Sequence, residues 1–386
     1  MITYQELYNA YLECYKNKKK SPGAMDFLFS YQANLRILLK EINERTYRPS
    51  PSTVFIITDP KIREVFAADF RDRIIHHLII KELLPLFEDY FIKESFSCMP
   101  GRGTLYGIQT MAQMLDKCPS EWYVMKMDIT SFFMNIRKSW LRDALESFIR
   151  AKYKNSRKLE DLVWLVSTIV MNDPTKNCIR VGDLELIKIL PKHKSLFFLP
   201  PDFGLPIGNY SSQMFANFYM TALDYYVKYE LGIDMYGRYV DDFLMFGEKD
   251  YLLSCAPKIR TFTKERLGLE VSKDKFYFQP VNHGVKFLGS MIMPGRIYCG
   301  NRVRGEFEKA LYKEYPDLDS ALSSFNSYLG LIRHYSSYNI REKIMSNLPN
   351  GWNMYFVPSK DYTKLLRLKS SESLIYVENV PNVKIM

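Results

Sequence analysis

Cysteine is sparse and scattered in this chain. The six cysteines form no Cys-x-x-Cys pair; they are Cys14, Cys98, Cys118, Cys178, Cys255 and Cys299. This spacing favours neither a zinc knuckle nor a disulfide framework. We therefore expect all six to be reduced structural residues.

Long hydrophobic runs are also missing. No stretch approaches the roughly 18 consecutive apolar residues that a membrane-spanning helix needs. The first six residues, Met-Ile-Thr-Tyr-Gln-Glu, lack the basic-then-apolar order of a signal peptide. These two absences predict a soluble, intracellular protein with no membrane partner.

Acidic residues are outnumbered, with 43 Asp and Glu against 53 Lys and Arg and a formal net charge of +10. Such a balance favours a polyanionic partner, either nucleic acid or an acidic membrane surface. Hydrophobic residues make up 47% and charged residues 25%, as in folded globular proteins. A chain of 386 residues suits two or three subdomains that share a groove.

Hydrophobic periodicity predicts a mixed α and β chain. Helices are predicted over 2–45 (two helices), 71–90, 140–151, 159–170, 211–230 and 251–267, and strands over 54–57, 122–127, 235–246, 269–278 and 285–291. Residues 152–200 show little pattern, and residues from 301 onward are predicted to be mainly helical.

Two polar clusters have ordinary structural interpretations. The lysines at 16, 18, 19 and 20 form either a solvated helix end or a phosphate-contacting patch. His76 and His77 are adjacent on a predicted helix, so their side chains point about 100° apart and do not easily share a metal ion. We interpret both histidines as structural or surface residues.

Asp241 and Asp242 lie between two apolar segments, which predicts two strands joined by a tight turn at the acidic pair. Acidic dipeptides cap turns in many proteins, so this pair alone is weak evidence. Adjacent unpaired carboxylates repel each other unless a cation neutralises them. With Asp128 at the end of its own strand, they form an oxygen-rich set for two Mg²⁺ ions about 3.5–4 Å apart.

These residues resemble the palm of reverse transcriptases. Residues 128–133 (Asp-Ile-Thr-Ser-Phe-Phe) look like motif A and residues 239–242 (Tyr-Val-Asp-Asp) look like motif C, and the match runs in order along nearly the whole chain. The resemblance implies an RNA-directed DNA polymerase with an α+β right-hand fold. Its fingers would span residues 1–123, its palm of antiparallel sheet and helices 124–293, and its helical thumb and C-terminal tail 294–386.

The resemblance also implies roles for single residues. Ile129 would add a backbone carbonyl to the metal site, Phe133 would exclude a 2′-hydroxyl, and Lys275 of motif D would protonate the departing pyrophosphate. The residues implied to contact the nucleotide are Arg63, Arg73, Ile129, Phe133, Ile207, Gly208 and Gln213, and those implied to contact primer or template are Arg102, Tyr239 and Gly289.

Ordinary alternatives stay open for several of these residues. Phe133 can also be interpreted as a core phenylalanine, Arg73 as a salt-bridge partner of Asp69, Lys275 as a surface lysine and Gly289 as a strand-end glycine.

Motif B, residues 204–213, departs from the usual pattern of the family, with Ile207 before the glycine and Gln213 at its end. With Tyr-Leu-Gly-Leu-Ile-Arg-His-Tyr at 328–335, this form resembles reverse transcriptases of diversity-generating retroelements, within the group II intron-like enzymes. The resemblance implies copying of a template-repeat RNA into cDNA with errors at adenine, in a bacterial or phage-infected cell. It also implies an accessory variability protein, a small basic helical oligomer.

Two other interpretations of the function stay open. One is a retron, group II intron-like or phage-defence reverse transcriptase, which shares the chemistry but copies another template. The other is a non-enzymatic nucleic-acid-binding scaffold, suggested by the basic charge and the 28 tyrosines. The presence of all three aspartates argues against the scaffold.

Overall fold

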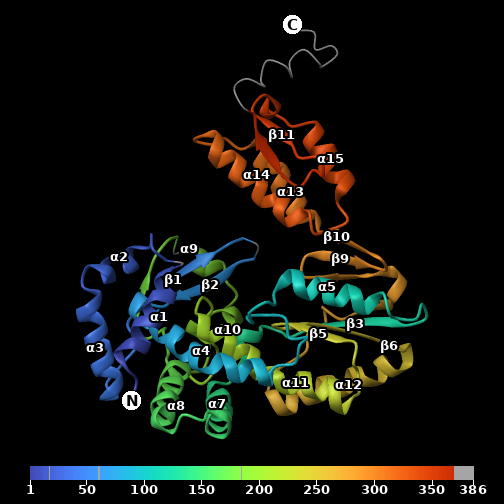
Figure 1. Cartoon of the computed structure of the whole chain (residues 1–386). Coiled ribbons are helices and arrows are strands. Elements are labelled where there is room, and N and C mark those ends of the chain that lie inside the picture. Colours follow the sequence, from blue (N-terminus) through green and yellow to red (C-terminus); the bar gives the residue numbers. More distant parts are fainter. Residues whose placement is uncertain (17, 60, 184, 369–386) are drawn as a thin grey trace. The chain divides into compact units, whose positions relative to one another are not determined.

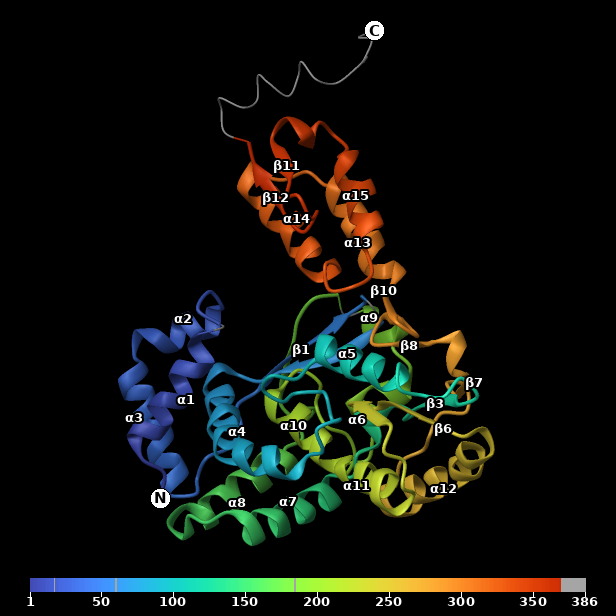
Figure 2. The ribbon, with the colours of Figure 1, turned by 45° about the vertical axis from the view of Figure 1, so that its right-hand side comes forward.

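The computed structural model describes residues 1–16, 18–59, 61–183 and 185–368. Two compact units make up this part of the chain. The first holds residues 1–103, 125–245 and 249–277, and the second holds 104–124, 246–248 and the chain from 278 onward. Both units combine helices and strands (Figures 1 and 2). The division into three parts at residues 123 and 293 stays a prediction.

The first unit begins with helices that pack on one another. They are α1 (Tyr4–Lys16), α2 (Pro22–Phe29), α3 (Tyr31–Asn43) and α4 (Phe70–Tyr90). The second helix expected within 2–45 is divided at Ser30, whose φ of −132° and ψ of 33° are not helical. The break lets Tyr31 stack on Tyr11, with ring centroids 5.5 Å apart, while Phe27 packs on the same tyrosine. Tertiary aromatic packing therefore overrides the continuous helical pattern.

A small sheet follows the helices, with strands β1 (Ser52–Ile57), β2 (Arg63–Ala67) and β4 (Cys178–Arg180). β1 pairs antiparallel with β2 and parallel with β4. Only the first of these strands was predicted. β4 lies within 152–200, where α8 (Ser156–Met171) and α9 (Glu185–Ile189) also occur, and α7 (Lys138–Lys152) packs against α8.

A four-stranded sheet has the order β5-β6-β3-β7. Its strands are β5 (Tyr236–Tyr239), β6 (Asp242–Gly247), β3 (Tyr123–Asp128) and β7 (Tyr277–Pro280). The helical elements near these strands in the sequence are α6 (Phe132–Asn135), α10 (Tyr210–Tyr219), α11 (Thr221–Tyr225), the π-helical turn η3 (Tyr226–Glu230) and α12 (Lys249–Leu267). The helix expected over 211–230 is thus interrupted at Met220. The strand expected from Leu269 begins only at Tyr277, because the residues before it form single backbone bonds rather than a ladder.

The second unit contains the three-stranded sheet β10-β9-β8 and a separate hydrophobic core. Its elements are α5 (Thr104–Leu115), β8 (Val285–Phe287), β9 (Ser290–Met293), β10 (Arg296–Cys299), α13 (Asn301–Tyr312), α14 (Leu318–Ile332), α15 (Tyr338–Ser346), β11 (Phe356–Pro358) and β12 (Leu365–Arg367). Phe307, Phe325 and Phe356 are buried together with leucines of the same segments. For residues 301–368 the expected helical character is confirmed, and the β11–β12 pair adds to it; the rest of the predicted tail, residues 369–386, lies outside the described residues. In the described part of the chain no helix is both long and apolar enough to cross a membrane.

Candidate active site

The acidic pair lies in a hairpin turn between β5 and β6. Tyr239 pairs with Asp242, which leaves Val240 and Asp241 as a two-residue loop and confirms the predicted turn. Val240 has a φ of 60°, in the left-handed region that a β-branched residue rarely adopts. Such a conformation costs about 1–3 kcal/mol and persists only where surrounding contacts enforce it. The turn is therefore a strained element held by its neighbours.

Asp128 is the last residue of β3, and backbone hydrogen bonds hold it beside this turn. The amide of Ile129 donates to the carbonyl of Asp241 at 3.2 Å. On the other side the amide of Ser272 donates to the Asp128 carbonyl, and Thr130 donates to Glu270, both at 2.8 Å. Three segments far apart in the sequence thus meet at the aspartates.

The electrostatics of the site favour a bound cation. Burial, followed by the negative charge of Asp128, raises the pKa of Asp241 to about 6. Burial also raises the pKa of Asp242, against the opposing effect of Lys126. The Oδ1 atom of Asp242 is buried and accepts no hydrogen bond from the described residues. Repelling carboxylates with an unsatisfied oxygen are the donors that a hard divalent cation prefers.

Two lysines approach the carboxylates. Lys126 Nζ lies 2.9 Å from Asp242 Oδ2, and Lys275 pairs with Asp128. Among the described residues, no three acidic, histidine or cysteine side chains have the arrangement of a formed metal site. The fit to Mg²⁺ therefore rests on the all-oxygen donor set and the unsatisfied Oδ1 atom. Lys126 was missed in the sequence, although its place two residues before Asp128 puts both side chains on one face of β3.

Residues 58–292 match the family described as reverse transcriptase (RNA-dependent DNA polymerase). The chain belongs to this family. Membership of this family agrees with the predicted α+β polymerase fold class. The mixture of helices and sheets described above agrees with it as well.

The chain is also similar to a curated protein and to a solved structure. Protein YkfC of Escherichia coli K12 is 23% identical over 304 residues, which cover 69% of this chain and 73% of that protein. A telomerase structure from Candida albicans, in complex with the TWJ fragment of telomeric RNA, matches with a TM-score of 0.47 and 13% identity. That match covers 82% of this chain, which spans 58% of the telomerase chain.

In this reverse transcriptase, Phe133 and Ile207 contact one hydrophobic cluster. Its buried members are Val54, Phe66, Met134 and Leu196. The amide of Leu205 donates to the Phe133 carbonyl, and the amide of Phe66 donates to the Ile207 carbonyl, both at 2.8 Å. The structure thus brings two of the seven residues predicted to contact the nucleotide against the same apolar cluster.

Gly208 is required by close approach of motif B to β2. Its φ is +120°, and a Cβ there would lie 2.8 Å from Val65 Cγ1 and 2.9 Å from the Phe66 carbonyl oxygen. The next residue, Asn209, accepts a hydrogen bond from the Ala68 amide at 3.1 Å. Packing on β2 therefore explains this glycine; its predicted approach to the nascent base pair stays a prediction.

Three other residues predicted to contact the nucleotide, Arg63, Arg73 and Gln213, lie in the first unit and, within the described part of the chain, share no hydrogen-bond partner with one another. Arg63 is exposed at the start of β2. Arg73 donates from Nε to the Ala68 carbonyl at 2.8 Å, while Asp69 accepts from the Arg71 amide and caps α4. Gln213 accepts a hydrogen bond from Cys98 Sγ at 3.6 Å. Their contact with a triphosphate stays a prediction.

Of the residues predicted to contact primer or template, Arg102 and Gly289 have clear structural roles. Arg102 donates to the carbonyls of Ile92 and Ser95 at 2.6 and 3.0 Å. Gly289, with φ of +81°, follows Leu288 in the two-residue turn between β8 and β9, where both residues are left-handed. Tyr239 is half-buried beside the acidic turn.

The adjacent histidines contact the first turn of α10. His76 is buried and its Nδ1 atom contacts Ser211 Oγ, and the His77 ring lies 5.3 Å from that of Tyr210. Burial, followed by the charges of His77 and Arg73, lowers the pKa of His76 to about 3. These contacts agree with the structural interpretation of His76 and His77.

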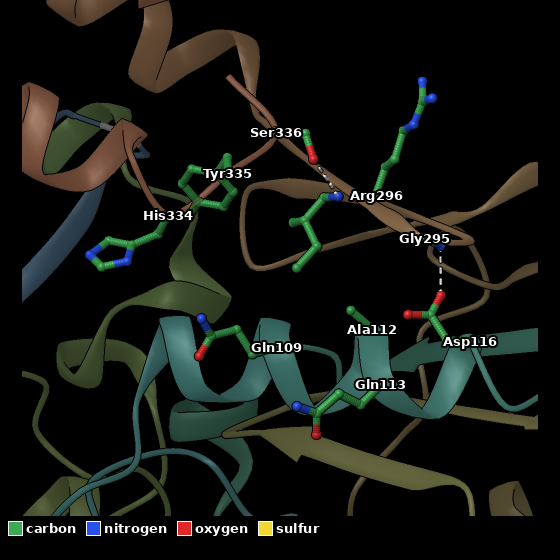
Figure 3. A pocket seen from close by; sticks show the side chains of 10 residues that line it. Gln109, Ala112, Gln113, Asp116, Gly295, Arg296, His334, Tyr335 and Ser336 are labelled. Carbon is green, nitrogen blue, oxygen red and sulfur yellow. Dashed lines mark hydrogen bonds between the residues drawn. The ribbon is translucent and has the colours of Figure 1, made fainter. Parts of the chain in front are cut away.

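The second unit contains an open cleft of about 540 Å³. It is lined by Gln109 and Gln113 of α5, by Asp116 directly after this helix, by residues 295–297 and by residues 334–336. Figure 3 shows the Gln109 side chain pointing from α5 toward His334 and Tyr335, and the Arg296 side chain pointing away from α5. The Gly295 amide donates to Asp116 at 2.6 Å, which fixes the β9–β10 turn against α5.

Proposed function

We propose that this reverse transcriptase extends a primer on an RNA template by a two-Mg²⁺ nucleotidyl transfer at Asp128, Asp241 and Asp242. The observation that carries the proposal is the juxtaposition of these aspartates through the Ile129–Asp241 backbone bond. When bound, the ions activate the primer 3′-hydroxyl and neutralise the leaving phosphates. The substrates are deoxynucleoside triphosphates and the product is a cDNA strand.

Residues around the aspartates supply positioning and proton transfer. In this proposal Lys275, which pairs with Asp128, protonates the departing pyrophosphate. Phe133 limits the space at the sugar, Arg63 and Arg73 hold the triphosphate, and the Ile129 carbonyl adds a ligand. The cleft in the second unit offers amide, hydroxyl and imidazole groups that suit a sugar-phosphate backbone.

The decisive experiment replaces Asp241 with Asn. The change removes one negative charge from a buried carboxylate group and keeps its shape, so synthesis on primed RNA with Mg²⁺ should fall at least about 10³-fold. Asp274→Asn, a nearby change outside the aspartate set, serves as the matched control, and circular dichroism checks that both variants fold. Substantial synthesis by folded Asp241→Asn would show that the acidic pair is only structural.

A finer proposal concerns the template and fidelity. We infer that the enzyme copies the template-repeat RNA of a diversity-generating retroelement with adenine-directed errors, together with an accessory variability protein. Ile207 and Gln213 in motif B support this proposal, since Ile207 is packed against an apolar cluster and offers no side-chain hydrogen-bond donor. Loose positioning of the incoming sugar then tolerates mispairs.

Ile207→Gln tests this account of fidelity. The glutamine amide supplies a donor near the incoming nucleotide, so misincorporation opposite adenine should fall severalfold in a purified copying assay read by sequencing. Ile207→Leu, which keeps the apolar character, is the control and should keep the parental error rate. An unchanged adenine error rate in Ile207→Gln would refute the fidelity proposal and leave the polymerase proposal intact.

A further inference from the structure

The residue immediately before the active-site tyrosine is a fully buried arginine. Arg238 is 0% exposed on β5. Its Nε and Nη2 atoms donate to the two carboxylate oxygens of Asp224 at 2.6 and 2.5 Å, in the bidentate geometry that arginine forms with carboxylates. Asp224, on α11, is 0% exposed as well.

The remaining donors of Arg238 reach three further segments. Nη1 donates to Asn217 Oδ1 at 2.8 Å and to the Val240 carbonyl at 2.9 Å, and Nη2 also donates to Ser95 Oγ at 3.2 Å. A guanidinium has five N–H donors, and these contacts use all of them. The arginine therefore connects α10, α11 and the segment before Arg102 to the active-site turn.

The bond to Val240 acts at the strained point of that turn. Val240 has the left-handed φ of 60°, and its carbonyl belongs to the peptide group that carries the amide of Asp241. A hydrogen bond from a charged donor to this carbonyl fixes the plane of that peptide. Since a β-branched residue does not hold this conformation by itself, the contact selects it.

A buried ion pair is a poor way to gain stability. Desolvation of two charges can exceed their attraction, and apolar residues of similar volume are often equally stable or more so. The geometry of the turn offers another reason for the Arg238–Asp224 pair. Asp224 holds the guanidinium of Arg238 in place, and the guanidinium in turn holds the Val240 carbonyl. Tyr236 adds a hydrogen bond to the same Asp224 carboxylate at 2.7 Å but none to the turn.

We infer that Arg238, held by Asp224, is a positioning residue that keeps the Val240–Asp241 peptide in the orientation needed for metal binding by Asp241. The inference rests on the proposed function, since it assigns a task to residues behind the same site. Because Arg238 is fully buried, we assign it no direct contact with substrate or metal.

Two variants remove the bond to Val240 in different ways. Asp224→Leu/Arg238→Met replaces the buried pair with apolar residues. Arg238→Lys keeps a positive charge for Asp224 but replaces the five forked donors of arginine with three donors on one nitrogen, so we expect the bond to Val240 to be lost. In either folded variant we expect kcat to fall about 10- to 100-fold, as for the loss of one hydrogen bond from a charged group. The Mg²⁺ concentration for half-maximal activity should rise about tenfold, with the KM for primed template unchanged.

The matched control is Tyr236→Phe. It removes a buried hydrogen bond from the same Asp224 carboxylate and leaves the Arg238–Val240 bond in place. Its thermal stability should fall, while its kcat and Mg²⁺ requirement stay within about twofold of the parent. Calorimetric binding of Mn²⁺ to each protein gives a readout that does not depend on synthesis, and only the Arg238 variants should bind Mn²⁺ more weakly.

Each outcome decides the inference. Folded Arg238 variants with parental kcat and Mn²⁺ affinity would overturn it, as would a Tyr236→Phe protein that loses as much as they do. Failure of both Arg238 variants to fold where Tyr236→Phe folds would also overturn it, because the network would then serve the fold alone. A parental protein without any polymerase activity would defeat the proposed function, while the Mn²⁺ isotherms would still test Arg238.

Discussion

The three aspartates differ in what surrounds them. Asp128 pairs with Lys275, a side chain that is 53% exposed, and Asp242 pairs with the less exposed Lys126. Asp241 has a raised pKa of about 6, caused first by burial and then by its acidic neighbours. Of the three, Asp241 is therefore the carboxylate whose charge most needs a bound cation.

Acid sensitivity is a prediction at the residue scale, and it concerns His76. Its folded-state pKa of about 3 lies below the ordinary value of 6.5, so on acidification the unfolded chain takes up the proton first. The stability due to neutral His76 is complete above pH 6.5 and is lost progressively as the pH falls toward 3. At pH 5 this loss amounts to about 2 kcal/mol.

His76→Asn tests that loss. Asparagine keeps a polar group near Ser211 but has no proton to gain, so the variant should lose less stability than the parent between pH 7 and pH 5 in urea unfolding. His193→Asn, at an exposed position, is the control and should follow the parent. Equal acid sensitivity of parent and His76→Asn would contradict the assignment.

At the scale of elements, the motif B loop is built onto strand β2. The Phe66 amide donates to Ile207, and Gly208 leaves no room for a side chain beside Val65. The buried Glu64 of β2 accepts hydrogen bonds from Ser195 and Leu196, which hold the segment that precedes motif B. The β1–β2 hairpin therefore positions both ends of the 195–208 segment.

Gly208→Ala should break this attachment. A methyl group 2.8 Å from Val65, at a φ of +120°, combines overpacking with backbone strain, and we expect a loss of roughly 2–4 kcal/mol in the free energy of unfolding. Urea unfolding of the full chain measures this loss. Gly23→Ala in α2, where the new Cβ would be at an ordinary 3.6 Å from Phe70, should change stability by less than about 1 kcal/mol. Similar effects of both substitutions would refute the steric explanation.

At the scale of the whole molecule, the net charge of +10 predicts a strong electrostatic contribution to RNA binding. Lysine and arginine contacts to phosphates release condensed cations, so the dissociation constant of primed RNA should rise at least about tenfold as monovalent salt increases from roughly 50 to roughly 200 mM. Fluorescence anisotropy measures the constant, and thermal melting over the same range checks that the fold is unaffected. A dissociation constant that does not change with salt would mean that phosphate contacts contribute little to the free energy of RNA binding.

Much of the active site was predictable because its residues carry their chemistry locally. The acidic pair between apolar strands predicted the hairpin turn, and the order of motifs A to D predicted the family. The helix break at Ser30 and the late start of β7 were not predictable, since both depend on contacts with distant segments. The roles predicted for the aspartates, and for residues outside that set such as Arg63 and Gln213, stay predictions.

The sequence by itself determined the family, the choice of the three aspartates as candidate metal ligands, and the basic character of the protein. Residue type and spacing contain that information. Only the tertiary structure decided which side chains lie around the aspartates and the turn that carries them. In the sequence Arg238 is an ordinary residue of a predicted strand. Only the folded chain buries it beside Asp224 and brings its guanidinium within hydrogen-bond distance of the Val240 carbonyl. Lys126 likewise meets Asp242 only when β3 and β6 lie side by side. Long-range pairing of buried charges leaves no periodic pattern in a sequence, which is why these contacts emerge only from the fold.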